Sequence, residues 1–188
     1  MAVRKRFLLV SLPALAWAQV AAAQPPGEPT NITPDTAPPL SLGTTTTQVG
    51  NVTTIDGGTR AGPNLFHSFS RFDLGQGDIA RWVHSGGDPS TLANVINRVT
   101  GGDPSDISGQ IDSTAIPNAD FWFINPAGVV FGQGAQVNVP AAAHFTTAQA
   151  LHFTAGPAFT VATPGGSTFS VASPAARAPR RFARLSSH

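Results

Sequence analysis

Short β-prone runs, each ended by glycine, asparagine, aspartate or proline, constrain the fold of this chain more than any other sequence feature. They recur from residue 41 to residue 173 and include TTTTQV, NVTTI, IARWV, FWFI and TFSV. Their β-branched and aromatic residues suit pleated, half-buried surfaces, and the residues between them suit turns. Only Thr91–Val99 could form a short helix, and its valine and isoleucine content makes a strand equally plausible. The pattern predicts an all-β chain.

The chain contains no cysteine, so disulfides cannot stabilise it. Hydrophobic residues make up 41% of the sequence and charged residues 11%, which is too apolar and too weakly charged for a typical disordered chain. We therefore expect burial and backbone hydrogen bonds to hold the fold together. Neither a metal nor another cofactor is expected, since His144 and His152 are too isolated for a metal site.

The net charge of +1 conceals an uneven distribution. Basic residues gather at both ends, whereas residues 24–176 hold four arginines and ten acidic residues, a net charge of −6. An acidic body would repel phosphate, so nucleic acid is excluded as a partner of the folded part.

The start of the chain, 1–23, has the layout of a secretory signal peptide. A basic stretch, Arg4–Arg6, precedes the apolar run Phe7–Ala18, and Ala21–Ala23 supplies small residues for cleavage before Gln24. As a helix, the apolar run would span about 18 Å, short of the roughly 30 Å of a bilayer core. No later stretch is long and apolar enough to be a second candidate, so we predict export without a remaining membrane span.

The rest of the chain divides by composition. Residues 24–40 hold six prolines and predict an extended leader. In the next part, 41–173, apolar runs begin at even intervals, at Ile107, Val129 and Leu151. A repeat of about 20 residues is typical of a solenoid, here of about six coils, although a β-sandwich also uses short strands and glycine-rich turns.

The most informative stretch is 121–139, FWFINPAGVVFGQGAQVNV. Within it, Asn125-Pro126-Ala127-Gly128 has the chemistry of a type I turn, with proline setting φ at the second position and glycine at the fourth. Taken by itself, this is an ordinary corner between two strands.

This stretch resembles the hallmark of the two-partner-secretion domain at the N-terminus of filamentous haemagglutinins and related adhesins and haemolysins. Ala127 stands where that family usually has asparagine. Two further blocks resemble the family in the same order: Gly58–Phe69 (GTRAGPNLFHSF), and Asn97–Gly102 followed by Pro104-Ser105 and Ile107–Gly109. The resemblance covers residues 41–173.

The resemblance implies a right-handed parallel β-helix of the pectin-lyase-like type with N-terminal capping strands. It also implies a secretion and folding-nucleation module, recognised as an extended chain by the periplasmic domains of an outer-membrane transporter. The residues expected to contribute to recognition, or only to the fold, are Asn64, Leu65, Phe66, His67, Phe69, Asn125, Pro126 and Gly128. Such a module is secreted or displayed at the cell surface after Sec export through the periplasm.

Two other classes of function are compatible with such a fold. Parallel β-helices also include polysaccharide lyases, whose sites need clustered carboxylates; the candidates are Asp103, Asp106, Asp112 and Asp120, with Arg98 as a base. Their settings are typical of turns, and His67 lacks a glycine-flanked nucleophile elbow nearby, so we expect no enzyme. The other class is an adhesive domain that binds host glycans or proteins at the cell surface.

The last segment, 174–188, switches to an arginine-rich composition and predicts a disordered tail. The switch is typical of a truncated or frameshifted gene end, or of a short natural tail. An uncovered last coil would expose strand edges, and we therefore expect self-association.

Overall fold

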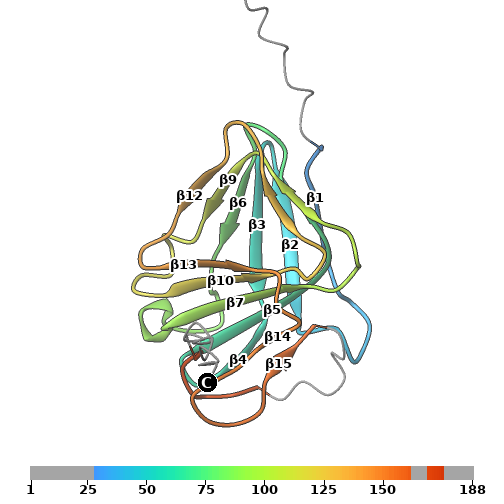
Figure 1. The fold of residues 1–188 in the computed structure, drawn as a ribbon. Helices are drawn as coiled ribbons and strands as arrows, with labels where there is room; N and C mark the ends of the chain where they lie inside the picture. Colours follow the sequence, from blue (N-terminus) through green and yellow to red (C-terminus); the bar gives the residue numbers. More distant parts are fainter. Residues whose placement is uncertain (1–27, 162–168, 176–188) are drawn as a thin grey trace, which may run out of the picture.

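The computed structural model describes residues 28–161 and 169–175, and these form almost only β-strands (Figure 1). Within them are fifteen strands and one short 3₁₀ helix, Pro89–Thr91. The predicted signal peptide, 1–23, and most of the predicted tail, 176–188, lie outside the described residues. Of the residues described, none forms a helix with the length and apolar character needed to cross a membrane.

Three sheets, whose strands pair in parallel from one coil to the next, form a β-solenoid of about four turns. The chain passes between the sheets and then returns to the next strand of the first. The first sheet, here called sheet one, contains β5 (Asn64–Asp73), β7 (Asn94–Val99), β10 (Asp120–Ile124) and β13 (Ala143–Thr146). The second sheet contains β3 (Val52–Gly57), β6 (Ile79–Trp82), β9 (Gln110–Asp112) and β12 (Gln136–Asn138). The third pairs β8 (Ser105–Ile107) with β11 (Val129–Phe131). The predicted all-β parallel β-helix is confirmed.

The coils are longer and fewer than the six expected from the sequence. In the second sheet, Val52 aligns with Ile79, Ile79 with Gln110, and Gln110 with Gln136, so each coil takes more chain than the expected repeat. Loops of unequal length at the corners, such as 83–93 and 113–119, lengthen the coils. The even spacing of the apolar runs therefore does not give the coil length.

Antiparallel strands cap the N-terminal end, as predicted. β2 (Thr44–Val49) covers the free edge of β3. β4 (Thr59–Ala61) and β1 (Asn31–Pro34) follow each other along the free edge of β5. β1 lies inside the predicted 24–40 leader, so part of that proline-rich stretch joins the sheet, and both edges of β5 are paired.

Thr91–Val99, which was open to either helix or strand, is mostly strand. The 3₁₀ helix ends at Thr91, and β7 begins at Asn94 with every residue buried. Because the side chains of Val95 and Val99 enter the solenoid while Ile96 lies on the opposite face, both faces of β7 need apolar residues.

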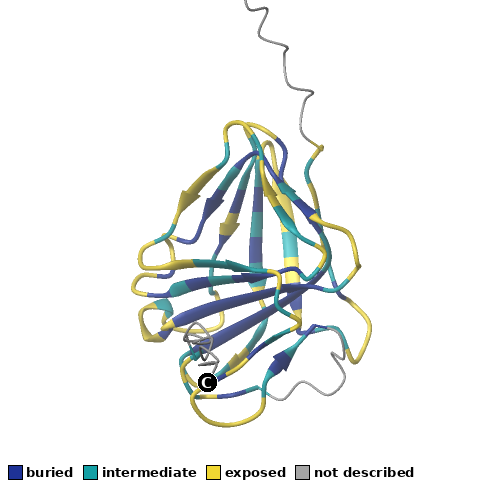
Figure 2. Ribbon diagram, viewed as in Figure 1, coloured by how far each residue is buried: buried dark blue, intermediate teal, exposed yellow. Residues whose placement is uncertain are grey.

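The solenoid interior is filled by aromatic and aliphatic side chains stacked from coil to coil. Figure 2 shows the buried residues concentrated along the strands of the solenoid. Phe72 lies 5.8 Å from Trp82 and 5.0 Å from Phe123, and Trp82 lies 4.8 Å from Phe121, measured between ring centroids. Each fully buried side chain of this size contributes about 1.5–3 kcal/mol of transfer free energy. Burial thus carries the stability that disulfides supply in many exported domains.

A last segment, residues 150–161 and 169–175, folds back over the outside of sheet one; we call it the closing segment. It contains the antiparallel pair β14 (Ala150–Leu151) and β15 (Phe159–Thr160) and a bridge between Phe153 and Pro174. It packs a second buried cluster against the outer face of sheet one.

At the corner after β7, we predict that adding one methyl group lowers the stability of the domain. A Cβ on Gly101 would lie 1.9 Å from the carbonyl oxygen of Ser70, a backbone atom that cannot move aside cheaply. We expect Gly101→Ala to lower the free energy of unfolding by about 1–3 kcal/mol in urea titrations followed by circular dichroism. Gly87→Ala is the control, since its Cβ would make only ordinary contacts at 3.6 Å, and it should change stability by less than about 0.5 kcal/mol. Equal stability of the two variants would contradict the observed corner.

Candidate functional site

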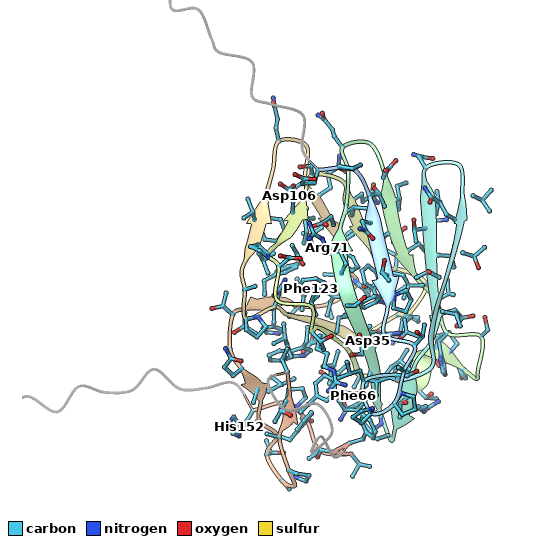
Figure 3. The ribbon with its side chains drawn as sticks, turned by 90° about the vertical axis from the view of Figure 1, so that its right-hand side faces the viewer. Asp35, Phe66, Arg71, Asp106, Phe123 and His152 are labelled. Carbon is cyan, nitrogen blue, oxygen red and sulfur yellow. The ribbon has the colours of Figure 1, made fainter. Side chains whose placement is uncertain are left out.

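The two segments expected to take part in recognition lie on sheet one and at its exit. Asn64–Phe69 is the first part of β5, and all six of its residues are buried. Leu65 and Phe69 point into the solenoid, whereas Phe66 belongs to the outer cluster under the closing segment. In Figure 3, Phe66 and His152 both lie in the lower part of the view, where the C-terminal strands cross.

Asn64 is a hub of buried hydrogen bonds. Its Nδ2 donates to the carbonyl oxygens of Ser170 and Ala172, both at 2.8 Å. Its Oδ1 accepts from Nδ2 of Asn94 at 2.8 Å, and Oδ1 of Asn94 accepts from Nε1 of Trp122 at 3.1 Å. This ladder joins three successive coils to the closing segment, so Asn64 does more than complete a turn.

The His67 ring is fully buried and makes few polar contacts. Its Nδ1 lies 3.3 Å from Oγ1 of Thr44, and its Nε2 has no hydrogen-bond partner among the described residues. Burial lowers the pKa of His67 to about 3; the Asp56 carboxylate opposes this shift and His84 adds to it. The ring is therefore neutral at pH 7 and serves packing.

The Asn125–Gly128 corner is a hydrogen-bonded turn, as its chemistry predicts. The Gly128 amide donates to the Asn125 carbonyl at 3.0 Å, and Oδ1 of Asn125 accepts from the Ala127 amide at 3.0 Å. Gly128 has φ of +131°, which favours glycine. Ala127 is exposed, so the turn accommodates alanine in place of the family's usual asparagine.

Asn125 also clamps this corner to the preceding coil. Its Nδ2 donates to the Asp103 carbonyl at 2.9 Å and to Oγ of Ser105 at 3.0 Å. The Ser105 amide in turn donates to the Gly128 carbonyl at 3.0 Å. The asparagine therefore fixes two corners of the solenoid relative to each other.

A buried polar network surrounds Arg98, which the sequence suggested only as the base of a lyase. Its guanidinium donates to Oγ of Ser68 at 2.8 Å, to the Thr160 carbonyl at 2.9 Å and to the Leu40 carbonyl at 3.2 Å. Ser68 donates to Asp35 at 2.6 Å. Burial lowers the pKa of Arg98 to about 10, although Asp35 opposes the shift, so the side chain stays charged. The signal in the sequence was the only charged residue of the strand NVINRV.

The four candidate carboxylates lie on different elements: Asp103 follows β7, whereas Asp106, Asp112 and Asp120 lie in β8, β9 and β10. The expected turn setting is therefore wrong for these last three. Asp103 pairs with Arg71 at 2.7 Å and Asp112 with Arg81 at 3.1 Å. Asp106 accepts from Ser108, and Asp120 accepts from the Ala142 amide. A hollow of about 1080 Å³ beside β13 is lined by residues that include Trp122, His144 and His152, and none of the four carboxylates lines it. Within the described ranges, no three histidine, cysteine or acidic residues gather closely enough to hold a metal ion.

Most of this chain matches a known protein family. The model of the TPS secretion domain family matches residues 30–183. This range includes the solenoid, the segments Asn64–Phe69 and Asn125–Gly128, and the closing segment. The chain belongs to the TPS secretion domain family.

One curated protein and one solved structure are similar to parts of this chain. Over 91 residues, this TPS domain is 35% identical to the heme/hemopexin-binding protein of Haemophilus influenzae, a match that covers 48% of this chain and 9% of that protein. The crystal structure of the HMW1 secretion domain from Haemophilus influenzae matches 64% of this chain and 27% of its own, with 21% identity and a TM-score of 0.42. The chain thus corresponds to a small part of the curated relative's length.

Membership in this family establishes the broad function. TPS domains are the secretion modules of two-partner-secretion exoproteins, and the module nucleates folding of the exported protein. The chain is therefore an exported protein, and the family points to a non-enzymatic secretion module.

The buried His67 predicts a loss of stability in mild acid. Since its pKa is about 3 in the folded state against 6.5 for an ordinary histidine, the unfolded chain takes up a proton that the folded chain does not as the pH falls from about 6.5 to about 3. The contribution of His67 to the free energy of unfolding is fully present above pH 6.5. Below pH 6.5 it falls by up to about 1.4 kcal/mol per pH unit.

Urea titrations at pH 7 and pH 4.5 test this effect. We expect His67→Gln to lose less stability between the two pH values than the natural chain does. His152→Gln, at an exposed histidine, is the control and should keep the full dependence. An unchanged pH dependence in His67→Gln would show that another group is responsible.

Proposed function

We propose that this TPS domain is recognised before it folds, by the periplasmic domains of an outer-membrane transporter that bind Asn64–Phe69 and Asn125–Gly128 as extended chain. The observation that best supports this proposal is burial. All six residues of Asn64–Phe69 are buried, and so is Asn125. A folded domain would hide these side chains from a partner, whereas an unfolded chain presents them.

The backbone of the first segment supports the same order of events. Binding of an extended strand to a partner's sheet uses the free backbone groups of that strand. In the folded domain, β5 pairs with β7 on one edge and with β4 and β1 on the other. Those groups are therefore free only before folding, and recognition by strand addition requires the unfolded chain.

The proposed route begins with the signal peptide, 1–23, which directs the chain through the Sec pathway into the periplasm. The transporter then passes the chain across the outer membrane, and the solenoid forms outside. The absence of cysteine suits this route, since no disulfide can lock the chain during periplasmic transit. The product is secreted or remains at the cell surface.

Adhesion to a host surface is assigned in this proposal to the exoprotein sequence that follows such a module. The chain corresponds to 9% of the length of the heme/hemopexin-binding protein, and that protein's named ligand is not carried over to this chain. A polysaccharide lyase is not supported by the carboxylates, because each lies on a different element and is engaged there in a hydrogen bond or ion pair.

Export of paired variants separates recognition from folding. Asn125→Ala and Asn64→Ala alter the proposed recognition segments, whereas Gly101→Ala destabilises the fold outside them. In cells that carry the cognate transporter, we expect each asparagine variant to be secreted about tenfold less than Gly101→Ala, corresponding to roughly 1.4 kcal/mol of binding free energy. Secretion of all three variants to the same extent would assign these asparagines to folding alone.

A further inference from the structure

The closing segment buries the outer face of sheet one, which would otherwise be an exposed apolar surface. Phe66, Ile96 and Ile124 lie on this face, one from each of three neighbouring strands, and all three are fully buried. Most of the residues packed with them come from the far end of the described chain: Leu151, Phe153, Phe159 and Val161, with Phe169 and Ala172 alongside. Leu42 is the one buried member of this cluster from the N-terminal part.

Aromatic contacts centre this packing on Phe66. Its ring centroid lies 5.0 Å from that of Phe159, 5.2 Å from that of Phe169 and 6.1 Å from that of Phe153. A Cβ on Gly62 would lie 3.2 Å from Cβ of Val171, so the turn before β5 also fits closely against the segment. The GTRAGPNLFHSF block is therefore the receiving surface for the end of the domain.

Two buried polar side chains depend on the same segment. Both hydrogen bonds donated by Nδ2 of Asn64 go to its carbonyl oxygens, at Ser170 and Ala172. Arg98 donates to the Thr160 carbonyl at 2.9 Å, and its guanidinium carbon lies 4.6 Å from the centre of the Phe159 ring. Without the segment, these groups would lose those partners while three large apolar side chains became exposed.

These contacts join residues that are very far apart along the chain. Asn64 and Ala172 are separated by 108 positions, and Arg98 and Thr160 by 62. Such contacts can form only when nearly the whole domain is present in one compartment. The outer face of sheet one can therefore be covered only after the last residues of the domain have entered the same compartment.

We propose that the closing segment is a folding latch: the solenoid becomes stable only when residues 150–161 and 169–175 have docked on the outer face of sheet one. Until then, the chain stays unfolded. The consequence for export rests on the proposed function, since a latch at the end of the domain keeps the recognition segments extended until the last residues of the domain have entered the periplasm.

The first test uses point variants of the full chain in solution, without any transporter. Phe159→Ala removes the central ring of the latch, and Thr154→Ala changes an exposed side chain of the same segment. Hydrogen exchange is measured at β9, which belongs to the second sheet and does not contact the segment through the outer cluster.

If the latch holds the entire solenoid, Phe159→Ala will accelerate exchange at β9 at least tenfold, together with exchange at β5, and Thr154→Ala will not. If the segment is an independent flap, Phe159→Ala will accelerate exchange within the segment and at the outer face only. The second result would overturn the proposal.

Truncation provides a second and stronger variant. A chain that ends at residue 175 keeps the latch and is expected to show the same urea transition as the full chain. A chain that ends at residue 149 lacks the latch and is expected to show no cooperative transition. A cooperative transition of the shorter chain at the full chain's midpoint would contradict the latch. Because these measurements contain no transporter, failure of the proposed recognition would leave their outcome unchanged.

Discussion

Sheet one must be buried on both faces, and the rest of the structure follows from this requirement. Its inner face carries Leu65, Val95 and Phe121, and its outer face carries Phe66, Ile96 and Ile124. The solenoid covers the first face by winding around it, but no coil can cover the second. A parallel sheet with two apolar faces needs a second layer, and the closing segment supplies it. The N-terminal strands complete the arrangement by covering the free edge of β5.

The signature residues act mainly in holding these layers together. Asn64 ties three coils to the closing segment, and Asn125 ties one corner of the solenoid to the next. Both side chains donate hydrogen bonds to backbone carbonyl groups of other segments. The same residues carry the proposed recognition because an extended chain displays what the fold later encloses. In the proposed function, recognition and folding therefore compete for one set of side chains.

Local chemistry was predictable from the sequence, and long-range packing was not. The Asn125–Gly128 turn follows from proline and glycine at fixed positions, and the capped parallel β-helix follows from the resemblance of three blocks. The coil number was wrong because corner loops such as 83–93 carry no periodic signal. The closing segment escaped prediction because Phe153, Phe159 and Phe169 lie in runs that look like further coils. The role of Asn64 was equally hidden, since its partners lie 106 and 108 positions away along the chain.

In the proposed function, the domain is recognised unfolded and hides its recognition segments once folded. The most direct test is a binding titration of the transporter's isolated periplasmic domains against two forms of the same chain. One form is native, and the other is freshly diluted from urea and measured before it refolds. We expect binding to the freshly diluted chain that disappears at the rate of refolding, and no binding to the native chain. Equal affinity for the two forms would contradict it.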